Sequence, residues 1–247
     1  MTRLAALVPA NTLRATKSRL APLLTPEERD LLAHVMLVDV LQAVHASGVA
    51  EIVFVVSADG HLLEHAWEQG AVPVPEPAGG AGGLNPALEL ARRAALVERP
   101  EALLVVLADL PELRPEDLRA FVLPLPDGPR VRICPADDGG TNLLLLRPPD
   151  AIPFRYGGQS AAAHRAEAEV HGLPVEERRV PGASRDVDTP ADVARLLREA
   201  GSTTTGVFLR RWGIDPEVAE EPARRLPPRT GGGLPAGEKP ARLRRDR

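Results

Sequence analysis

Short apolar segments alternate with longer helix-like segments along this chain. Residues 4–9, 52–56 and 103–107 are almost wholly apolar, and none shows the alternation of apolar and polar positions expected of a strand with one face in water. Segments of this length are typical of strands that are buried on both faces. Such strands, separated by helices, predict an α/β fold with a mainly parallel sheet that helices cover on both faces.

The strongest helix signal follows Thr25. Thr25 as N-cap, Pro26 in the first turn and Glu28 three residues on form a capping box, and Gly48 provides a stop. Further helices are expected over residues 62–67, 85–98, 114–122 and 160–170, and the last one from residue 190 to near Ala200. Further strands are expected over residues 71–74, 131–134 and 143–146, with an edge strand over 176–180.

Composition excludes several classes of function. The single cysteine, Cys134, rules out a disulfide framework and a zinc site built on cysteines. Two Trp, one Tyr and four Phe are too few for a base-stacking surface, so no nucleic-acid partner is expected. No stretch approaches the roughly 20 apolar residues of a membrane span, and the first residues lack the apolar segment of a signal peptide. We therefore expect a cytoplasmic protein with no membrane partner.

The length of 247 residues fits one α/β domain, which we place at residues 1–200, followed by a C-terminal extension at 201–247. From residue 222 onward the chain carries eight basic and two acidic residues, with five Pro and four Gly. Such a segment buries too little apolar surface to offset the entropy of ordering it, so disorder is expected. A basic tail could contact RNA or anionic lipid, but a solvated extension without a specific partner is the simpler interpretation.

Four polar segments follow the predicted strands, at the sheet edge where open α/β folds bind their ligands. They are residues 9–19 with Lys17 and Arg19, the glycine-rich residues 79–85, Asp109, and the pair Asp186 and Asp188. Together they offer cationic side chains, backbone N–H groups and three carboxylates. That combination suits a nucleoside triphosphate with Mg²⁺.

These residues also have structural interpretations. Lys17 and Arg19 are compatible with surface charges, and the glycines with a plain connection. Asp109 and Asp188 could each cap a helix. Asp186 and Asp188, however, lie two apart and would repel each other on an extended chain unless a cation sat between them. The glycine loop lacks the Gly-Lys-Ser/Thr of a Walker A motif, and no G-x-G-x-x-G follows the first strand. His164, on a predicted helix, is expected to be structural or at the surface.

Several short motifs occur in the order and spacing of one known family. They are LVP at 7–9, TKSRL at 16–20, PEER at 26–29, MLVDVL at 36–41, GLN at 83–85, ADLP at 108–111, DGGTN at 138–142, YG at 156–157 with Ser160 and His164, and DVDTPAD at 186–192. Through these motifs residues 4 to about 200 resemble the guanylyltransferases of coenzyme F-420 biosynthesis, which act on phosphoenolpyruvate or 2-phospho-L-lactate.

The resemblance implies a single nucleotidyltransferase-type, Rossmann-like domain similar to nucleotide-diphospho-sugar transferases. It implies that GMP is joined, with Mg²⁺, from GTP to the phosphate of a three-carbon acid, and that pyrophosphate leaves. Phosphoenolpyruvate is the favoured acceptor and 2-phospho-L-lactate the next; some members use 3-phospho-D-glycerate.

The resemblance also assigns residues. The positions that match metal ligands are Asp109, Asp186 and Asp188. Those that match acid-binding positions are Thr141, Gly157 and Ser160. The expected catalytic residues are Asp109, Lys17 and Arg19, and the expected nucleotide-binding residues are Pro9, Lys17, Arg19, Gly83 and Asn85.

One position departs from the family pattern. Members commonly carry a lysine where this chain has Asn11, so one expected triphosphate contact is missing, and Arg14 is a candidate replacement. Because of this departure, a non-catalytic GTP-binding regulator remains one alternative function. A nucleotidyltransferase for another acceptor, such as a molybdopterin or a sugar phosphate, is the other alternative. The oligomeric state is open, with a homodimer as one option.

Overall fold

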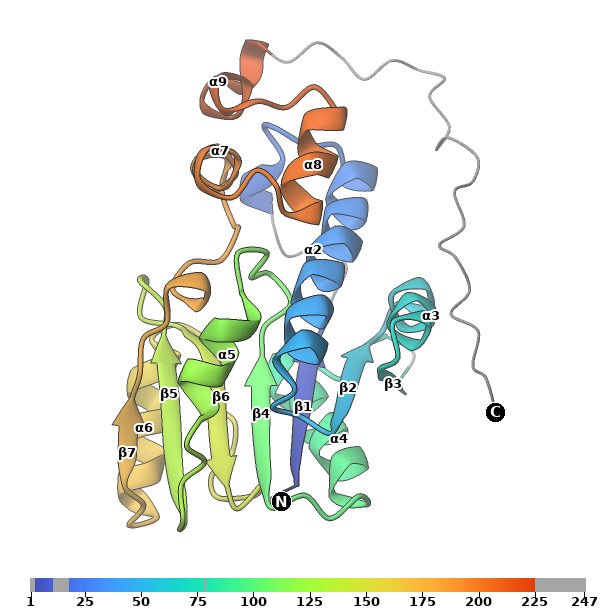
Figure 1. The fold of residues 1–247 in the computed structure, drawn as a ribbon. Coiled ribbons are helices and arrows are strands. Elements are labelled where there is room, and N and C mark those ends of the chain that lie inside the picture. Colours follow the sequence, from blue (N-terminus) through green and yellow to red (C-terminus); the bar gives the residue numbers. More distant parts are fainter. Residues whose placement is uncertain (1–2, 11–17, 78, 225–247) are drawn as a thin grey trace.

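A seven-stranded sheet forms the centre of the computed structural model, which describes residues 3–10, 18–77 and 79–224 (Figure 1). Its strand order is β3-β2-β1-β4-β6-β5-β7. The strands are β1 (Leu4–Pro9), β2 (Ile52–Ser57), β3 (Val72–Pro75), β4 (Ala102–Val106), β5 (Arg130–Pro135), β6 (Thr141–Arg147) and β7 (Val175–Glu177). β6 runs antiparallel to both its neighbours, and the other pairs are parallel. The predicted mainly parallel, mixed sheet is confirmed.

Helices cover both faces of the sheet. One face packs against α2 (Pro26–Ser47), α3 (Gly60–Glu68) and α5 (Pro115–Val122), and the other against α4 (Leu84–Leu96) and α6 (Ser160–Val170). Along β1, Ala6 and Val8 face the first set of helices and Leu7 faces the second. Both sets of positions are therefore removed from water, which is why the strand sequences are apolar throughout.

The long helix α2 begins and ends as predicted. The Thr25 hydroxyl accepts from the Glu28 N–H at 3.3 Å, the Glu28 carboxylate accepts from the Thr25 N–H at 2.9 Å, and Gly48 ends the helix with a φ of 65°. The expectation that no stretch approaches a membrane span is wrong for α2, which alone among the described helices is long and apolar enough to match one, with half of the matching window buried. Its packing against the sheet explains its apolar composition.

The C-terminal helices form a third apolar cluster beyond the carboxyl ends of the parallel strands (Figure 1). They are α7 (Pro190–Glu199), α8 (Thr204–Arg211) and α9 (Pro216–Glu220), and they pack with the N-terminal half of α2 and with η1 (Ser18–Leu20). The helix predicted from residue 190 to near Ala200 is confirmed as α7, but the expectation that it is the last helix is wrong, because α8 and α9 follow it. The predicted boundary at residue 200 falls inside one packed cluster, while residues 225–247 of the predicted disordered tail lie outside the described chain.

The edge strand β7 is shorter than predicted. It pairs in parallel with β5 over three residues, and the chain then leaves the sheet and forms η2 (Pro181–Ala183). Arg178 still donates its N–H to the Ile133 carbonyl, but its side chain turns to the end of α5. The last short helix described is η3 (Pro222–Arg224).

Candidate active site

Three aspartates converge at the carboxyl edge of the sheet. Asp109 follows β4, and Asp186 and Asp188 precede α7. The Val187 N–H donates to the Asp109 carbonyl at 3.2 Å, which brings the two segments side by side. One carboxylate oxygen from each aspartate lies within 4.8 Å of the others, and all three residues are half-buried. The structure thus brings together the three residues that were predicted to be metal ligands.

Other residues cap the neighbouring helices. The N-cap of α7 is Thr189, whose hydroxyl accepts from the Asp192 N–H while the Asp192 carboxylate accepts from the Thr189 N–H. The N-cap of α5 is Arg114. The alternative interpretation of Asp109 and Asp188 as helix caps is therefore wrong, and neither is placed here by a capping role.

The donor set of this cluster fits a divalent cation. Three carboxylates this close repel one another unless a positive charge lies between them. Hard oxygen ligands of this kind are those that Mg²⁺ prefers, with one or two carboxylates completed by waters and phosphate oxygens. The Asp109, Asp186 and Asp188 cluster can therefore hold a metal.

A β-bulge aims Thr141 at the helix layer that contains α6. β5 pairs Pro135 with Thr141 and Cys134 with Leu143, which leaves Asn142 as an extra residue. In a regular strand without a bulge, Thr141 would lie on the same face as Leu143, two residues further along. With the bulge, the Thr141 hydroxyl reaches α6, while the Asn142 amide donates to the Ala183 carbonyl on the opposite face at 2.9 Å. Bulges commonly redirect side chains beside active sites in this way.

The predicted acid-binding residues meet at the start of α6. The Ser160 hydroxyl lies 3.2 Å from the Thr141 hydroxyl, and both side chains are buried. Gly139 packs against Gln159 so closely that a Cβ there would come within 2.6 Å of its amide oxygen. Gly157, exposed just before α6, has a φ of 148°, a conformation that favours glycine.

His164 belongs to the same cluster. Its Nδ1 lies 3.1 Å from the Thr141 Oγ1, and its Nε2 accepts from the Arg155 N–H at 3.0 Å. Burial lowers the pKa of His164 to about 4; the charge of Glu167 raises it and that of Arg155 lowers it further. The ring is therefore neutral at pH 7. The sequence places His164 on a helix but does not show its long-range partners, so this contact could not be predicted from it.

The glycine-rich segment leads into α4 beside Gly157. Gly79, Gly80, Gly82 and Gly83 all have positive φ, and Gly83 is the N-cap of α4. Asn85 in the first turn uses both ends of its side-chain amide on Tyr156: it donates to the carbonyl at 2.9 Å and accepts from the N–H at 2.7 Å. The side chain of Asn85 thus fixes two site segments to each other, a role that the sequence did not reveal.

The remaining predicted residues lie at the same edge or outside the described chain. Pro9 ends β1 and is buried. Arg19 is exposed on η1, next to Leu20, which packs in the cluster with α7 to α9. Lys17, Asn11 and Arg14 fall outside the described residues, so their predicted roles stay predictions.

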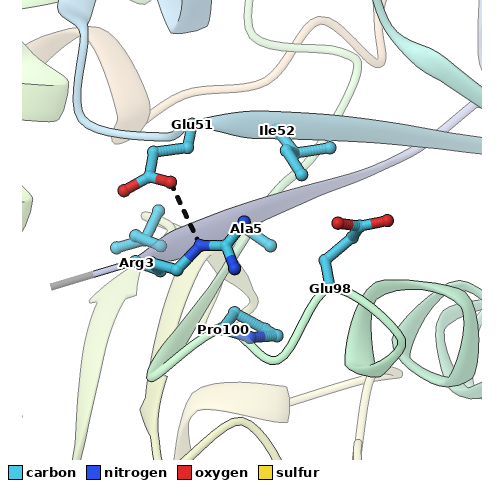
Figure 2. Close-up of a pocket in the computed structure, with 7 residues that line it drawn as sticks. Arg3, Ala5, Glu51, Ile52, Glu98 and Pro100 are labelled. Atoms are coloured by element: carbon cyan, nitrogen blue, oxygen red, sulfur yellow. Dashed lines mark hydrogen bonds and ion pairs between the residues drawn. The ribbon is translucent and has the colours of Figure 1, made fainter.

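Two hollows in the part of the chain that the structure describes are not lined by the three aspartates. One is at the opposite end of the sheet, where Arg3 and Glu51 form an ion pair at 3.3 Å beside the starts of β1 and β2 (Figure 2). The other, between α5, η2 and α7, is lined by side chains that already form ion pairs, such as Arg195 with Glu112. Neither offers the three-carboxylate arrangement of the sheet edge.

Residues 4–228 match the family described as "Guanylyl transferase CofC like". The chain belongs to this family. Members of the CofC-like family are guanylyltransferases, so the protein is a nucleotidyltransferase, and this membership fits a role in coenzyme F-420 biosynthesis. Because the match extends to residue 228, it includes α8 and α9, and the expectation that the resemblance ends near residue 200 is wrong.

Several curated relatives in this family are 36% or more identical to the chain over the aligned residues. A phosphoenolpyruvate guanylyltransferase of Sphaerobacter thermophilus is 42% identical over 195 residues, which cover 79% of this chain and 93% of that protein. A 3-phospho-D-glycerate guanylyltransferase of Phenylobacterium zucineum is 36% identical over 187 residues, covering 74% and 84%.

Solved structures support the predicted fold type. The chain is similar to a putative nucleotide-diphospho-sugar transferase from Desulfovibrio desulfuricans, with a TM-score of 0.70 and 18% identity over 90% of this chain and 98% of that one. At this identity the likeness concerns the fold alone. It confirms the expectation of a nucleotidyltransferase-type domain.

Proposed function

We propose that this CofC-like protein joins GMP from GTP to the phosphate of a three-carbon acid, with phosphoenolpyruvate as the favoured acceptor. The observation that carries the proposal is the cluster of Asp109, Asp186 and Asp188 at the same sheet edge as Thr141 and Ser160. A cation site beside buried hydroxyl donors suits two phosphate-bearing substrates that must meet. Relatives named for phosphoenolpyruvate support this acceptor.

The reaction needs little proton chemistry. A phosphate oxygen of the acid attacks the α-phosphorus of GTP, the bond to the β-phosphate oxygen breaks, and pyrophosphate leaves with the electron pair. The attacking oxygen is already anionic, so no strong base is required, and catalysis depends on positioning and charge neutralisation. Bound Mg²⁺ would neutralise charge on the phosphates from its ligands Asp109, Asp186 and Asp188.

The chain's own residues have separate roles in binding the two substrates. Lys17 and Arg19 neutralise the triphosphate. Pro9, Gly83 and Asn85 border the nucleotide, with backbone N–H groups of the glycine-rich segment facing phosphate. Thr141, Ser160 and the Gly157 backbone hold the phospho-acid, and the start of α6 favours an anion there.

Pyrophosphate release tests the proposal. The full chain with GTP and Mg²⁺ is given phosphoenolpyruvate, 2-phospho-L-lactate or 3-phospho-D-glycerate in separate reactions. We expect the fastest release with phosphoenolpyruvate. Faster release with 3-phospho-D-glycerate would assign the acceptor of relatives such as that of P. zucineum. GTP binding without release for any acid would overturn the proposal and favour a regulator or another acceptor.

A further inference from the structure

Thr141, Ser160 and His164 form a buried polar cluster whose hydrogen bonds have a defined direction. The three side chains are at most 1% exposed. A buried hydroxyl or imidazole left without a partner destabilises the fold, so these groups depend on the contacts within the cluster. Those contacts join the start of β6 to the first two turns of α6.

The direction begins at the backbone of Arg155. Its N–H can only donate, and it points to the His164 Nε2 at 3.0 Å. This nitrogen must therefore accept and carries no proton. In a neutral imidazole the proton then lies on Nδ1, the nitrogen that faces the Thr141 Oγ1 at 3.1 Å. His164 is consequently a hydrogen-bond donor to Thr141.

The two hydroxyls continue this direction of hydrogen bonding. Ser160 donates to the Thr141 Oγ1 at 3.2 Å, so this oxygen accepts from both His164 and Ser160. The Thr141 hydroxyl must then point its proton out of the cluster. If Thr141 instead donates to Ser160, the Ser160 hydroxyl points its proton out of the cluster. In both arrangements one hydroxyl proton remains for a bound acceptor, and the part of the chain that the structure describes gives these hydroxyls no other protein acceptor.

We propose that His164 is a positioning residue, which orients the Thr141 and Ser160 hydroxyl pair so that one of its two protons is donated to an anionic oxygen of the phospho-acid. The inference rests on the proposed function, because it concerns recognition of that acid. The lowered pKa of His164 agrees with a neutral ring but is not needed for the directional argument. His164 does not itself touch the reacting atoms.

Two substitutions separate the two contacts of the imidazole. In His164→Asn the side-chain NH₂ can replace Nδ1–H toward Thr141. In His164→Gln the longer side chain can replace Nε2 as the acceptor for the Arg155 N–H but loses the donor to Thr141. We expect His164→Gln to raise the KM of phosphoenolpyruvate about tenfold or more, and His164→Asn to raise it no more than about threefold. The KM of GTP should stay within about twofold in both.

A double-mutant cycle tests whether His164 acts through Thr141. In a Thr141→Val background, His164→Gln should add less than about a twofold further increase in the KM of phosphoenolpyruvate. His171→Gln is the matched control: His171 follows α6, is exposed, and bonds only its own helix, so both KM values should stay unchanged.

The outcomes are distinct. Retention of acid affinity by the Asn variant and its loss in the Gln variant would support the inference. An unchanged acid KM in His164→Gln, or equal increases in the acid and GTP KM values, would overturn it while the proposed function stands. A wild-type protein that releases no pyrophosphate with any of the three acids would overturn both. If His164→Gln does not fold, a tenfold higher acid KM in folded His164→Asn also counts against the inference.

Discussion

Asn85 pairs its side-chain amide with the backbone of Tyr156, donating to its carbonyl at 2.9 Å and accepting from its N–H at 2.7 Å. The two residues are 71 positions apart, and the pairing imitates one step of a β-ladder. It ties the start of α4, after the glycine-rich segment, to the segment that contains Gly157. The proposed nucleotide and acid sites are thus joined by one side chain.

Asn85→Ala removes both hydrogen bonds. We expect the free energy of unfolding to fall by about 1–3 kcal/mol because the two half-buried Tyr156 backbone groups lose their partners, and we expect the KM of the acid to rise. Urea unfolding and steady-state kinetics measure the two effects. Asn85→Asp keeps the acceptor for the Tyr156 N–H and should be intermediate. If Asn85→Ala matches the wild type in both, the pairing contributes nothing.

Asp188→Asn keeps the shape of the cluster and removes one negative charge. If Asp188 holds the cation that neutralises the phosphates, turnover should fall by about 10² or more, the loss expected for one main charge-stabilising group. Initial rates over a range of Mg²⁺ concentrations measure this. Asp137→Asn is the control, because Asp137 is an exposed carboxylate that pairs with Arg179 and Arg185. A near-normal kcat in Asp188→Asn would remove Asp188 from the metal site.

The sequence predicted those parts of the structure whose determinants are local. The capping box of Thr25 and Glu28, the stop at Gly48 and the apolar strands needed only neighbouring residues. The three aspartates were noted for their places after a strand or before the last helix, and the family resemblance matched them to metal ligands. The bulge that redirects Thr141 depends on pairing with β5, so no local sequence pattern predicts it. The amide of Asn85 likewise has partners far along the chain.

The helices after Ala200 were missed although local signals exist. Thr203 and Asp215 are the N-caps of α8 and α9, and both accept from helix N–H groups. The neighbouring Pro- and Arg-rich sequence hid these short helices. The start of α8 has a distant anchor: the Asp39 carboxylate accepts from the Thr204 N–H at 2.9 Å and from the N–H and hydroxyl of Thr205 at 2.8 and 2.7 Å. This contact explains the aspartate inside the MLVDVL motif.

Truncation tests the role of the C-terminal helices. A chain that ends at residue 200 loses Leu209 and Ile214, which are fully buried, and exposes Leu196 and Leu32. We expect its free energy of unfolding to fall by about 4 kcal/mol or more. A chain that ends at residue 224 should retain wild-type stability and activity. Equal thermal midpoints for the two truncated chains would contradict this account.

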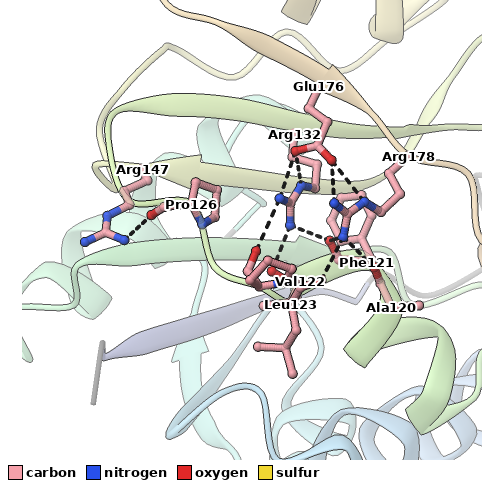
Figure 3. A network of polar contacts seen from close by, with 10 residues as sticks. Ala120, Phe121, Val122, Leu123, Pro126, Arg132, Arg147, Glu176 and Arg178 are labelled. Carbon is pink, nitrogen blue, oxygen red and sulfur yellow. Dashed lines mark hydrogen bonds and ion pairs between the residues drawn. The ribbon is translucent and has the colours of Figure 1, made fainter.

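Arg132 and Arg178 converge on Glu176 and on the last carbonyls of α5 (Figure 3). Arg132 is buried and donates to the Phe121 and Val122 carbonyls at 2.7 and 2.8 Å. Arg132→Met should lower the free energy of unfolding by about 3 kcal/mol, because the Val122 carbonyl loses its donor and the Phe121 carbonyl and Glu176 keep only Arg178. Arg165→Met, which removes only an exposed ion pair with Glu177, should cost less than about 1 kcal/mol. Similar losses in the two variants would contradict the assigned role.

The same network predicts a loss of stability in acid. Burial acts to raise the pKa of Glu176, but its hydrogen bonds and charge interactions with Arg132 and Arg178 outweigh burial and lower it below 4.5. The stabilisation is therefore present above pH 4.5 and is lost as the pH falls through the lowered pKa in the folded state. Glu176→Gln should remove this part of the pH dependence. An unchanged acid limb in that variant would exclude Glu176 as its source.

The lowered pKa of His164 predicts a second loss of stability in acid, which begins at a higher pH than that of Glu176. Its pKa is about 4 in the folded protein and 6.5 without burial, so below pH 6.5 the unfolded chain takes up a proton that the folded protein refuses. Between pH 6.5 and 4 the wild type should lose about 3 kcal/mol of stability relative to His164→Gln. Urea unfolding at several pH values measures the difference. A difference that stays constant with pH would contradict a neutral buried ring.

The product of the reaction decides whether this protein joins GMP to phosphoenolpyruvate. Full-length protein is incubated with GTP, Mg²⁺ and phosphoenolpyruvate, and the mixture is followed by phosphorus NMR and mass spectrometry. Our account predicts an unsymmetrical diphosphate that joins GMP to phosphoenolpyruvate, formed in equal amount with pyrophosphate and lost in Asp188→Asn. Intact GTP, or GMP and pyrophosphate without a joined product, would contradict it.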